Sequence, residues 1–284
     1  MTRTLRLGHD RVVRSAPLGV QFRDVLDRRV VADGLQVALL DAQRPTKPLR
    51  LHASPSGVFV AHAVPGMTGF DAIEVASPGG MPNRYSLSVR DTMGRYVDAS
   101  IALDLPSDGL FEPACLHASP SADDTAPHVP LYSAATRPLP AALAVVRADL
   151  RLASNPEQAA SWARIELWLG TVLLSTGVAD ANGSLLLLCP LPAPREPTRR
   201  ASPPAGFERM AWDVSLRAYW NPAHRADPVP DLCDVHAQPE VTLLEARAPA
   251  TPLGTLQLRA GKPLIAATID SSFSSFSSFL FVAA

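Results

Sequence analysis

The amino-acid sequence predicts an all-β protein that contains two tandem β-sandwich domains with long proline-rich loops. Apolar and polar residues alternate with a period of two in many short segments, which is typical of strands with one buried face. Turn-forming residues separate these segments at short intervals. The 28 prolines are about twice the usual ~5% share and are scattered, which suits sheet edges and loops and disfavours long helices.

Residues 85–105 are the clearest strand, turn and strand unit. Every second residue is apolar in residues 85–89 and again in residues 97–105. Between them, Asp91 can accept a hydrogen bond from the backbone two residues on, and Gly94 can adopt a positive φ. This pattern predicts a hairpin with one solvent-facing side.

A second turn of the same kind occurs at Asp180-Ala-Asn-Gly183, between the apolar residues 173–174 and 185–188. We therefore expect a second hairpin there. The remaining strands are expected at residues 20–23, 35–39, 49–53, 57–61, 146–152, 165–169, 210–218, 241–244, 256–258, 264–269 and 279–282.

The distribution of prolines divides the chain into three parts. We expect an N-terminal sandwich over residues 1–111, a proline-rich connection over 112–140, and a C-terminal sandwich with a Ser/Phe tail over 141–284. The connection could instead wrap a domain or contact a neighbour. A second proline-rich stretch, residues 189–204, is expected to form an exposed loop.

Charge and hydropathy disfavour several classes of partner. The formal net charge is -1 and basic residues do not cluster, so neither nucleic-acid binding nor membrane binding is expected. The first residues lack the apolar core of a signal peptide, and no apolar run reaches the roughly 18 residues of a membrane-spanning helix. We expect cytoplasmic synthesis, with release by lysis or within a larger virion-like particle if the protein works outside the cell.

Three cysteines, Cys115, Cys189 and Cys233, have no recognisable spacing, and their odd number argues against a disulfide scaffold. We expect all three to be buried free thiols.

Motifs of enzymes and metal sites are absent from the sequence. The chain lacks a nucleophile elbow, a dinucleotide-binding glycine motif, a P-loop and a zinc-protease motif. Cysteine and histidine occur with other possible ligands in residues 115–128 and 233–236, but not at the spacing of structural zinc sites. The acidic pairs at 104 and 108 and at 240 and 245 are ordinary for solvent-facing strand positions. We therefore expect no enzymatic activity, no metal and no cofactor.

Aromatic residues are the candidate partner-binding residues. Trp168 lies on the polar side of its predicted strand, and Trp220 follows another strand, so either ring could bind a carbohydrate or a protein. Phe273, Phe276 and Phe279 are three residues apart, which fits neither strand nor helix. This segment is expected to form either a tucked loop or an apolar surface for a partner.

Two parts of the chain resemble the carboxypeptidase-regulatory-like, or transthyretin-like, sandwich family. The first is Val30-Val-Ala-Asp-Gly-Leu-Gln-Val-Ala-Leu, followed by Ser56-Gly-Val-Phe-Val and Val64-Pro-Gly. The second is residues 165–167 with 178–188 and Pro190-Leu-Pro. The resemblance implies Ig-like or transthyretin-like sandwiches.

The layout that includes residues 136–150 and 256–264 also resembles an uncharacterised protein encoded with phage-tail-like contractile injection particles. That resemblance implies a structural part without catalytic residues. We therefore expect a structural or adaptor subunit that contacts other subunits of a large assembly, with homo-oligomerisation left open. A module that binds carbohydrate or a cell-surface ligand is the alternative.

Overall fold

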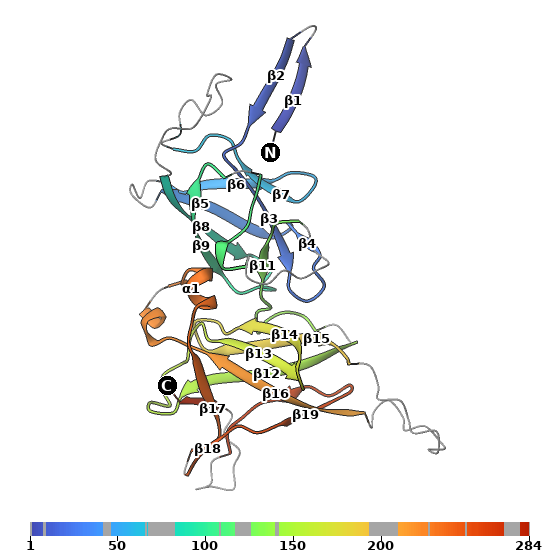
Figure 1. Ribbon diagram of the computed structural model, residues 1–284, viewed down its shortest axis with the longest axis vertical. Coiled ribbons are helices and arrows are strands. Elements are labelled where there is room, and N and C mark those ends of the chain that lie inside the picture. Colours follow the sequence, from blue (N-terminus) through green and yellow to red (C-terminus); the bar gives the residue numbers. More distant parts are fainter. Residues whose placement is uncertain are drawn as a thin grey trace, which may run out of the picture. The chain divides into compact units, whose positions relative to one another are not determined.

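A computed structural model gives the fold of the chain (Figure 1). It describes residues 2–7, 10–41, 47–65, 67, 83–107, 109–116, 126–139, 142–192, 210–226, 228–247, 249–269 and 279–283, and for 2–7, 10–15 and 225–226 it describes the backbone alone.

Strands dominate this structure, which confirms the predicted all-β class. The helical elements in the described residues are α1 (Leu232–His236) and the 3-10 turns η1 (Ala114–Leu116) and η3 (Pro222–Ala226). No described helix has the length and apolar character needed to cross a membrane.

The chain forms two compact units. Unit 1 comprises Met1–Met93, Asp98–Leu131 and Asp231–Asp234, and unit 2 comprises Gly94–Val97, Tyr132–Pro230 and Val235–Ala284. The change from unit 1 to unit 2 at Leu131 and Tyr132 falls inside the proline-rich segment expected as a connection, residues 112–140.

Unit 1 contains a curled sheet with the order β10-β3-β7-β6-β5-β8-β9, in which β4 and β11 also pair with β3. Its strands are β3 (Leu18–Asp24), β4 (Val30–Val31), β5 (Leu35–Asp41), β6 (Leu49–Ala53), β7 (Val58–Ala61), β8 (Asn83–Asp91), β9 (Ala99–Leu105), β10 (Leu110–Phe111) and β11 (Val129–Leu131). The leading residues form the two-stranded pair β1 (Thr2–Leu7) and β2 (Asp10–Ser15), which the sequence did not predict.

Strand β3 contributes to the core of unit 1 along its whole length and pairs with different strands in its two halves. Its first half pairs with β7 and β10, and Phe22 and Arg23 pair with β4 and β11. Leu18, Val20 and Phe22 are fully buried, and the Phe22 ring meets that of Phe59 edge to face at 5.4 Å. Strand β3 therefore connects β7 and β10, at its first half, to β4 and β11, at its second half.

The predicted hairpin at residues 85–105 is confirmed, with Tyr85 opposite Leu103 in the β8–β9 ladder. At its turn, Asp91 Oδ1 accepts a hydrogen bond from the Met93 amide at 3.2 Å, and Gly94 has a φ of 65°. The second strand begins at Ala99, two residues later than expected, because Val97 donates its amide to the Tyr132 carbonyl within unit 2.

Unit 2 contains a larger curled sheet with the order β14-β13-β16-β17-β21-β12-β15. Its strands are β12 (Leu143–Leu152), β13 (Arg164–Leu169), β14 (Val172–Val178), β15 (Ser184–Pro190), β16 (Ala211–Tyr219), β17 (Glu240–Arg247), β18 (Ala250–Pro252), β19 (Leu256–Arg259), β20 (Leu264–Ile265) and β21 (Leu280–Ala283). The expected strand near the C-terminus lies between β17 and β12, with Leu280 and Val282 in the core.

The expected second hairpin at residues 180–183 is wrong, although the turn itself forms. Asp180 Oδ1 accepts hydrogen bonds from the amides of Asn182 and Ser184 at 2.8 and 2.9 Å. This turn joins β14 to β15, which stand at opposite ends of the sheet order, and β14 instead forms a hairpin with β13. The sheet curls until Ser175 Oγ donates to the Leu188 carbonyl at 2.9 Å.

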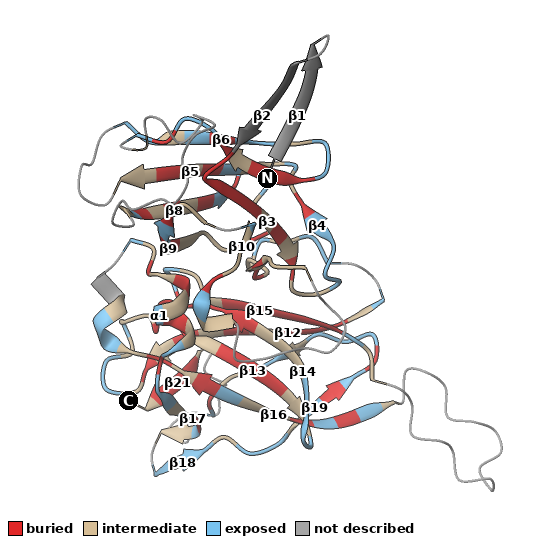
Figure 2. Ribbon diagram, turned by 45° about the horizontal axis from the view of Figure 1, so that its top comes forward, coloured by how far each residue is buried: buried red, intermediate tan, exposed pale blue. Residues whose placement is uncertain are grey.

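Burial explains why β15 lacks the alternation of the other strands. Its residues Leu185 to Cys189 are all buried, and Figure 2 shows this strand and β12 largely in red. A strand covered on both faces has no polar side, so its sequence is a continuous apolar run.

The expectation of three free thiols is wrong for two of them. Cys115 and Cys233 form a disulfide with a Cα–Cα distance of 5.3 Å, and both belong to unit 1. Cys189 is a buried free thiol, as expected. The two bonded cysteines are separated by 118 residues, so only the tertiary fold brings them together.

Candidate functional site

The outer face of β13 and β16 in unit 2 carries a group of charged and aromatic side chains in contact. Ile165 and Leu167 are fully buried in the core, so the alternate residues of β13 face the other side of the sheet. The ladder places them opposite residues of β16. We define the outer-face cluster as Arg164, Glu166, Trp168, Arg217 and Tyr219.

Glu166 is the centre of this cluster. Its carboxylate accepts hydrogen bonds from Arg164 Nη1 at 2.5 Å, Trp168 Nε1 at 3.0 Å and the Tyr219 hydroxyl at 3.3 Å. The residue is only 8% exposed. A buried carboxylate needs such donors, and three of them fix its position.

Two guanidinium groups stack on the aromatic rings of the cluster. The Arg164 guanidinium carbon lies 3.9 Å from the centre of the Tyr219 ring, and that of Arg217 lies 4.6 Å from the Trp168 ring. Such contacts are favourable for arginine because the ring face is electron-rich. Together with the bonds to Glu166, they fix the orientation of the Trp168 indole.

A second polar pair in unit 2 joins residues 104 positions apart. The Tyr132 hydroxyl and His236 Nε2 lie 2.7 Å apart. Burial raises the pKa of Tyr132 and lowers the pKa of His236 to about 4. The charges of Arg164 and Glu166 act on both pKa values in opposite directions. At neutral pH the phenol is therefore protonated and the imidazole is neutral, and the tautomer of His236 sets which of the two groups donates.

The two candidate tryptophans have different environments. Trp220 is 2% exposed, belongs to the core of unit 2 and donates its indole N–H to the Ser161 carbonyl at 3.1 Å. Its ring therefore offers no exposed face. Trp168 is half-buried on the outer face of β13.

Only one of the three candidate phenylalanines lies within the described residues. Phe279 is half-buried, with the Arg151 guanidinium 4.9 Å from its ring centre and the Phe281 ring 6.5 Å away. Phe273 and Phe276 lie outside the described residues. A role for this segment in partner binding stays a prediction.

Sequence reasoning missed an exposed aliphatic pair at the end of the same sheet. Leu173 lies directly opposite Trp168 in the β13–β14 ladder and is 45% exposed, and its neighbour Val172 is 58% exposed. We define the hairpin-tip patch as Trp168, Leu173 and Arg217; Val172 pairs with Leu169 and lies on the opposite face of the sheet. Two adjacent aliphatic residues directly after a Gly-Thr turn were the available signal for an exposed tip.

The cysteine and histidine groups whose spacing argued against a zinc site are not brought together as metal ligands in the described part of the chain. No group of three His, Cys, Asp or Glu residues that could hold a metal occurs there. Cys115 and Cys233 are bonded to each other, and His236 is bonded to Tyr132. The candidates at positions 117, 123 and 124 lie outside the described residues.

Comparison with known proteins does not assign the chain to a family. No protein-family model matches the sequence, and no curated protein matches it. Among solved structures, the chain is similar to the Bacillus anthracis TIE protein, with 7% identity over 90% of this chain and a TM-score of 0.25. It is also similar to a leucine-rich repeat protein from Bacteroides thetaiotaomicron, with 10% identity over 89% of this chain and a TM-score of 0.21.

The chain spans 34% of the length of the first of these structures and 26% of the second. At these TM-scores, neither likeness bears on the fold or the function of this chain.

Proposed function

We propose that this chain is a non-enzymatic structural or adaptor subunit of a multi-protein assembly. The observation that carries the proposal is the hairpin-tip patch of unit 2. It combines a tryptophan and an arginine, the residue types that dominate binding energy at protein interfaces, with the exposed side chain of Leu173.

The way in which the patch is held also supports binding to a protein. The Trp168 indole is fixed by its bond to Glu166 and by Arg217, so little side-chain freedom is lost when a partner covers it. Val172 and Leu173 begin β14, which stands at the end of the sheet order. The start of β14, before Ser175 meets β15, offers apolar contact and a short stretch of edge backbone to a neighbouring subunit.

The finer form of the proposal comes from the sequence resemblance. It takes each unit as an Ig-like or transthyretin-like sandwich of the carboxypeptidase-regulatory-like kind. It takes the assembly as a contractile, phage-tail-like injection particle, with the chain made in the cytoplasm and released within the particle. The Ser/Phe segment that contains Phe273 and Phe276 is proposed as a further contact to neighbouring subunits.

The test is the native mass of the species that contains this chain, purified gently from its source. We expect co-migration with a megadalton particle, and loss of that co-migration when Trp168→Ala and Leu173→Ser are combined. The matched control is Ile265→Ser, which changes a 67% exposed aliphatic residue of the same unit outside the patch. A wild-type chain that runs as a free 30.3 kDa monomer would rule out the proposal.

A carbohydrate- or cell-surface-binding module is the second candidate, because the partly exposed Trp168 ring lies beside charged hydrogen-bonding groups. Wild-type protein and the Trp168→Ala variant on a glycan array separate the two functions. Retention of the wild type alone would favour sugar binding. No retention by either, together with particle association, would favour the structural role.

A further inference from the structure

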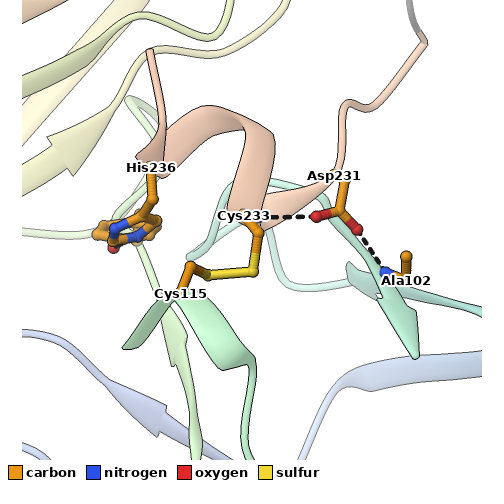
Figure 3. The surroundings of a disulfide bond; sticks show 6 residues. Ala102, Cys115, Asp231, Cys233 and His236 are labelled. Carbon is orange, nitrogen blue, oxygen red and sulfur yellow. Dashed lines mark hydrogen bonds between the residues drawn. A yellow bond between two sulfur atoms is a disulfide. The ribbon is translucent and has the colours of Figure 1, made fainter. Parts of the chain in front are cut away.

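Asp231 covers part of the edge of the unit 1 sheet. Strand β9 is the last strand in the sheet order and pairs on its other side with β8. Asp231 forms a parallel bridge with Ser100 of β9, and its Oδ2 accepts a hydrogen bond from the Ala102 amide (Figure 3). A carboxylate thus takes the place that the backbone carbonyl of a neighbouring strand would occupy.

The same carboxylate fixes the start of α1. Asp231 Oδ1 accepts a hydrogen bond from the Cys233 amide at 2.8 Å, as in a helix N-cap. One side chain therefore joins the beginning of α1 to the edge of β9. Leu232, which lies between Asp231 and Cys233 in the chain, is buried.

A covalent bond holds this short segment in place. Cys233 forms the disulfide with Cys115 of η1, and both cysteines belong to unit 1 together with Asp231 and Ala102. Figure 3 shows the disulfide directly beside Asp231. Cys115 and Cys233 are both partly exposed, whereas Cys189 is 1% exposed.

We propose that the Cys115–Cys233 disulfide is a redox latch that keeps Asp231 on the β9 edge, and that its reduction uncovers this edge. A dithiol supplies the two electrons. Its thiolate attacks the sulfur of one cysteine, which forms a mixed disulfide and releases the other cysteine as a thiolate. Its second thiol then displaces the cysteine held in the mixed disulfide, and the products are two cysteine thiols and an oxidised dithiol. No other bond in the chain changes.

Reduction leaves residues 231–234 held by weaker forces. The hydrogen bond from Ala102 to Asp231, the bridge between Asp231 and Ser100, and the burial of Leu232 remain, but each can open and close reversibly, unlike the disulfide. When Asp231 leaves, the Ala102 amide has no acceptor from this segment. The edge of β9 then becomes a free template for pairing with an extended chain.

The redox state of the Cys115–Cys233 disulfide depends on the cellular compartment. Disulfides persist in oxidising surroundings and are kept reduced in the cytosol. The β9 edge is therefore covered outside the cell and open in a reducing cytoplasm.

The experiment is native-state hydrogen exchange of the full chain, with and without dithiothreitol, read at the Ala102 amide by NMR or by short peptides across β9. We expect exchange at Ala102 to become at least about tenfold faster on reduction. Amides of β8 paired to β5 should keep their protection over the same minutes. Alkylation and intact mass should show that Cys115 and Cys233 have become thiols.

Two sets of variants separate the latch from general loosening. Asp231→Ala keeps the disulfide but removes the acceptor, so exchange at Ala102 should be fast under both conditions. Cys189→Ser, the matched cysteine control, should leave the response to the reductant unchanged. The inference is overturned if Ala102 exchanges equally in fully oxidised and fully reduced wild-type protein. It is also overturned if β8 loses protection to the same extent, because the disulfide then supports the whole unit.

Discussion

Glu166 and Arg164 form an ion pair that is removed from water, with side chains that are only 11% and 13% exposed. Taking charges out of water is costly, and each charge is tolerated only because the other is present. The pair therefore fixes the arrangement of the outer-face cluster and adds little to the net free energy of unfolding.

Replacing Glu166 by glutamine tests this interpretation. The variant keeps the shape of the side chain but leaves the Arg164 charge without its counter-charge, so we expect it to lower the free energy of unfolding by about 3 kcal/mol. Urea unfolding measures the change. Glu157→Gln is the control in the same unit, because Glu157 is exposed, and it should change stability by less than about 0.5 kcal/mol. Equal stability of the two variants would contradict the prediction.

His236 makes the stability of unit 2 depend on pH. Its pKa in the folded protein is about 4, below the ordinary value of 6.5, mainly because of burial. The unfolded chain therefore binds more protons between these two values, so the stabilisation is complete above pH 6.5 and is lost as the pH falls towards 4.

Urea unfolding of the wild type and the His236→Gln variant across this range measures the contribution of His236. The wild type should lose up to about 1.4 kcal/mol more per pH unit than the variant, because one extra proton is taken up on unfolding. Parallel pH profiles would show that His236 is not the group responsible.

At the scale of elements, turn geometry fixes where the strands of unit 2 change direction. Gly183 has a φ of 81°, and a Cβ atom there would collide with the Leu150 backbone carbonyl oxygen and press on Ala159. Gly170 has a φ of 59° in the β13–β14 turn, and a Cβ atom there would meet nothing within 4 Å.

This difference predicts unequal effects of alanine at the two glycines. Gly170→Ala should cost about 1 kcal/mol, which is the strain of a positive φ alone. Gly183→Ala should cost about 2 to 4 kcal/mol, because the backbone of β12 must also shift. Thermal or urea unfolding of both variants checks the order. A larger loss for Gly170→Ala would contradict the placement of the turn.

Contacts between residues that are close in the sequence could be predicted, whereas contacts between distant residues could not. The hairpin at residues 85–105 could be predicted because both strands and their turn are adjacent in the chain. At residues 180–183 the same turn chemistry is present, but the fully buried run of β15 contains no alternation that indicates its partner strand. That strand pairs with β12, which lies more than thirty residues earlier in the chain.

The candidate site shows the same limit. The alternation of Arg164, Glu166 and Trp168 with buried neighbours is visible in the sequence, so one side of the outer-face cluster could be predicted. The pairing of Tyr132 with His236 and of Cys115 with Cys233 joins residues more than one hundred positions apart. No local period or spacing encodes such contacts.

At the scale of the whole molecule, the path of the chain differs from two consecutive domains. The chain enters unit 2 at Gly94, returns to unit 1 at Asp98, leaves again at Tyr132, and contributes Asp231–Asp234 to unit 1 before it ends in unit 2. The division expected from proline content placed one change of domain near residues 112–140. Proline content can locate an irregular segment, but it cannot show that a later segment of the chain packs in the first unit.

The disulfide turns residues 115–233 into a closed covalent ring with two linear arms. A protease that cuts one peptide bond anywhere in that ring opens it without dividing the molecule. The nicked protein should therefore run as one species in a denaturing gel without reductant and as two fragments once reductant is added. A cut in either arm should release a fragment under both conditions, so a single pair of gel lanes locates any cleavage relative to the ring.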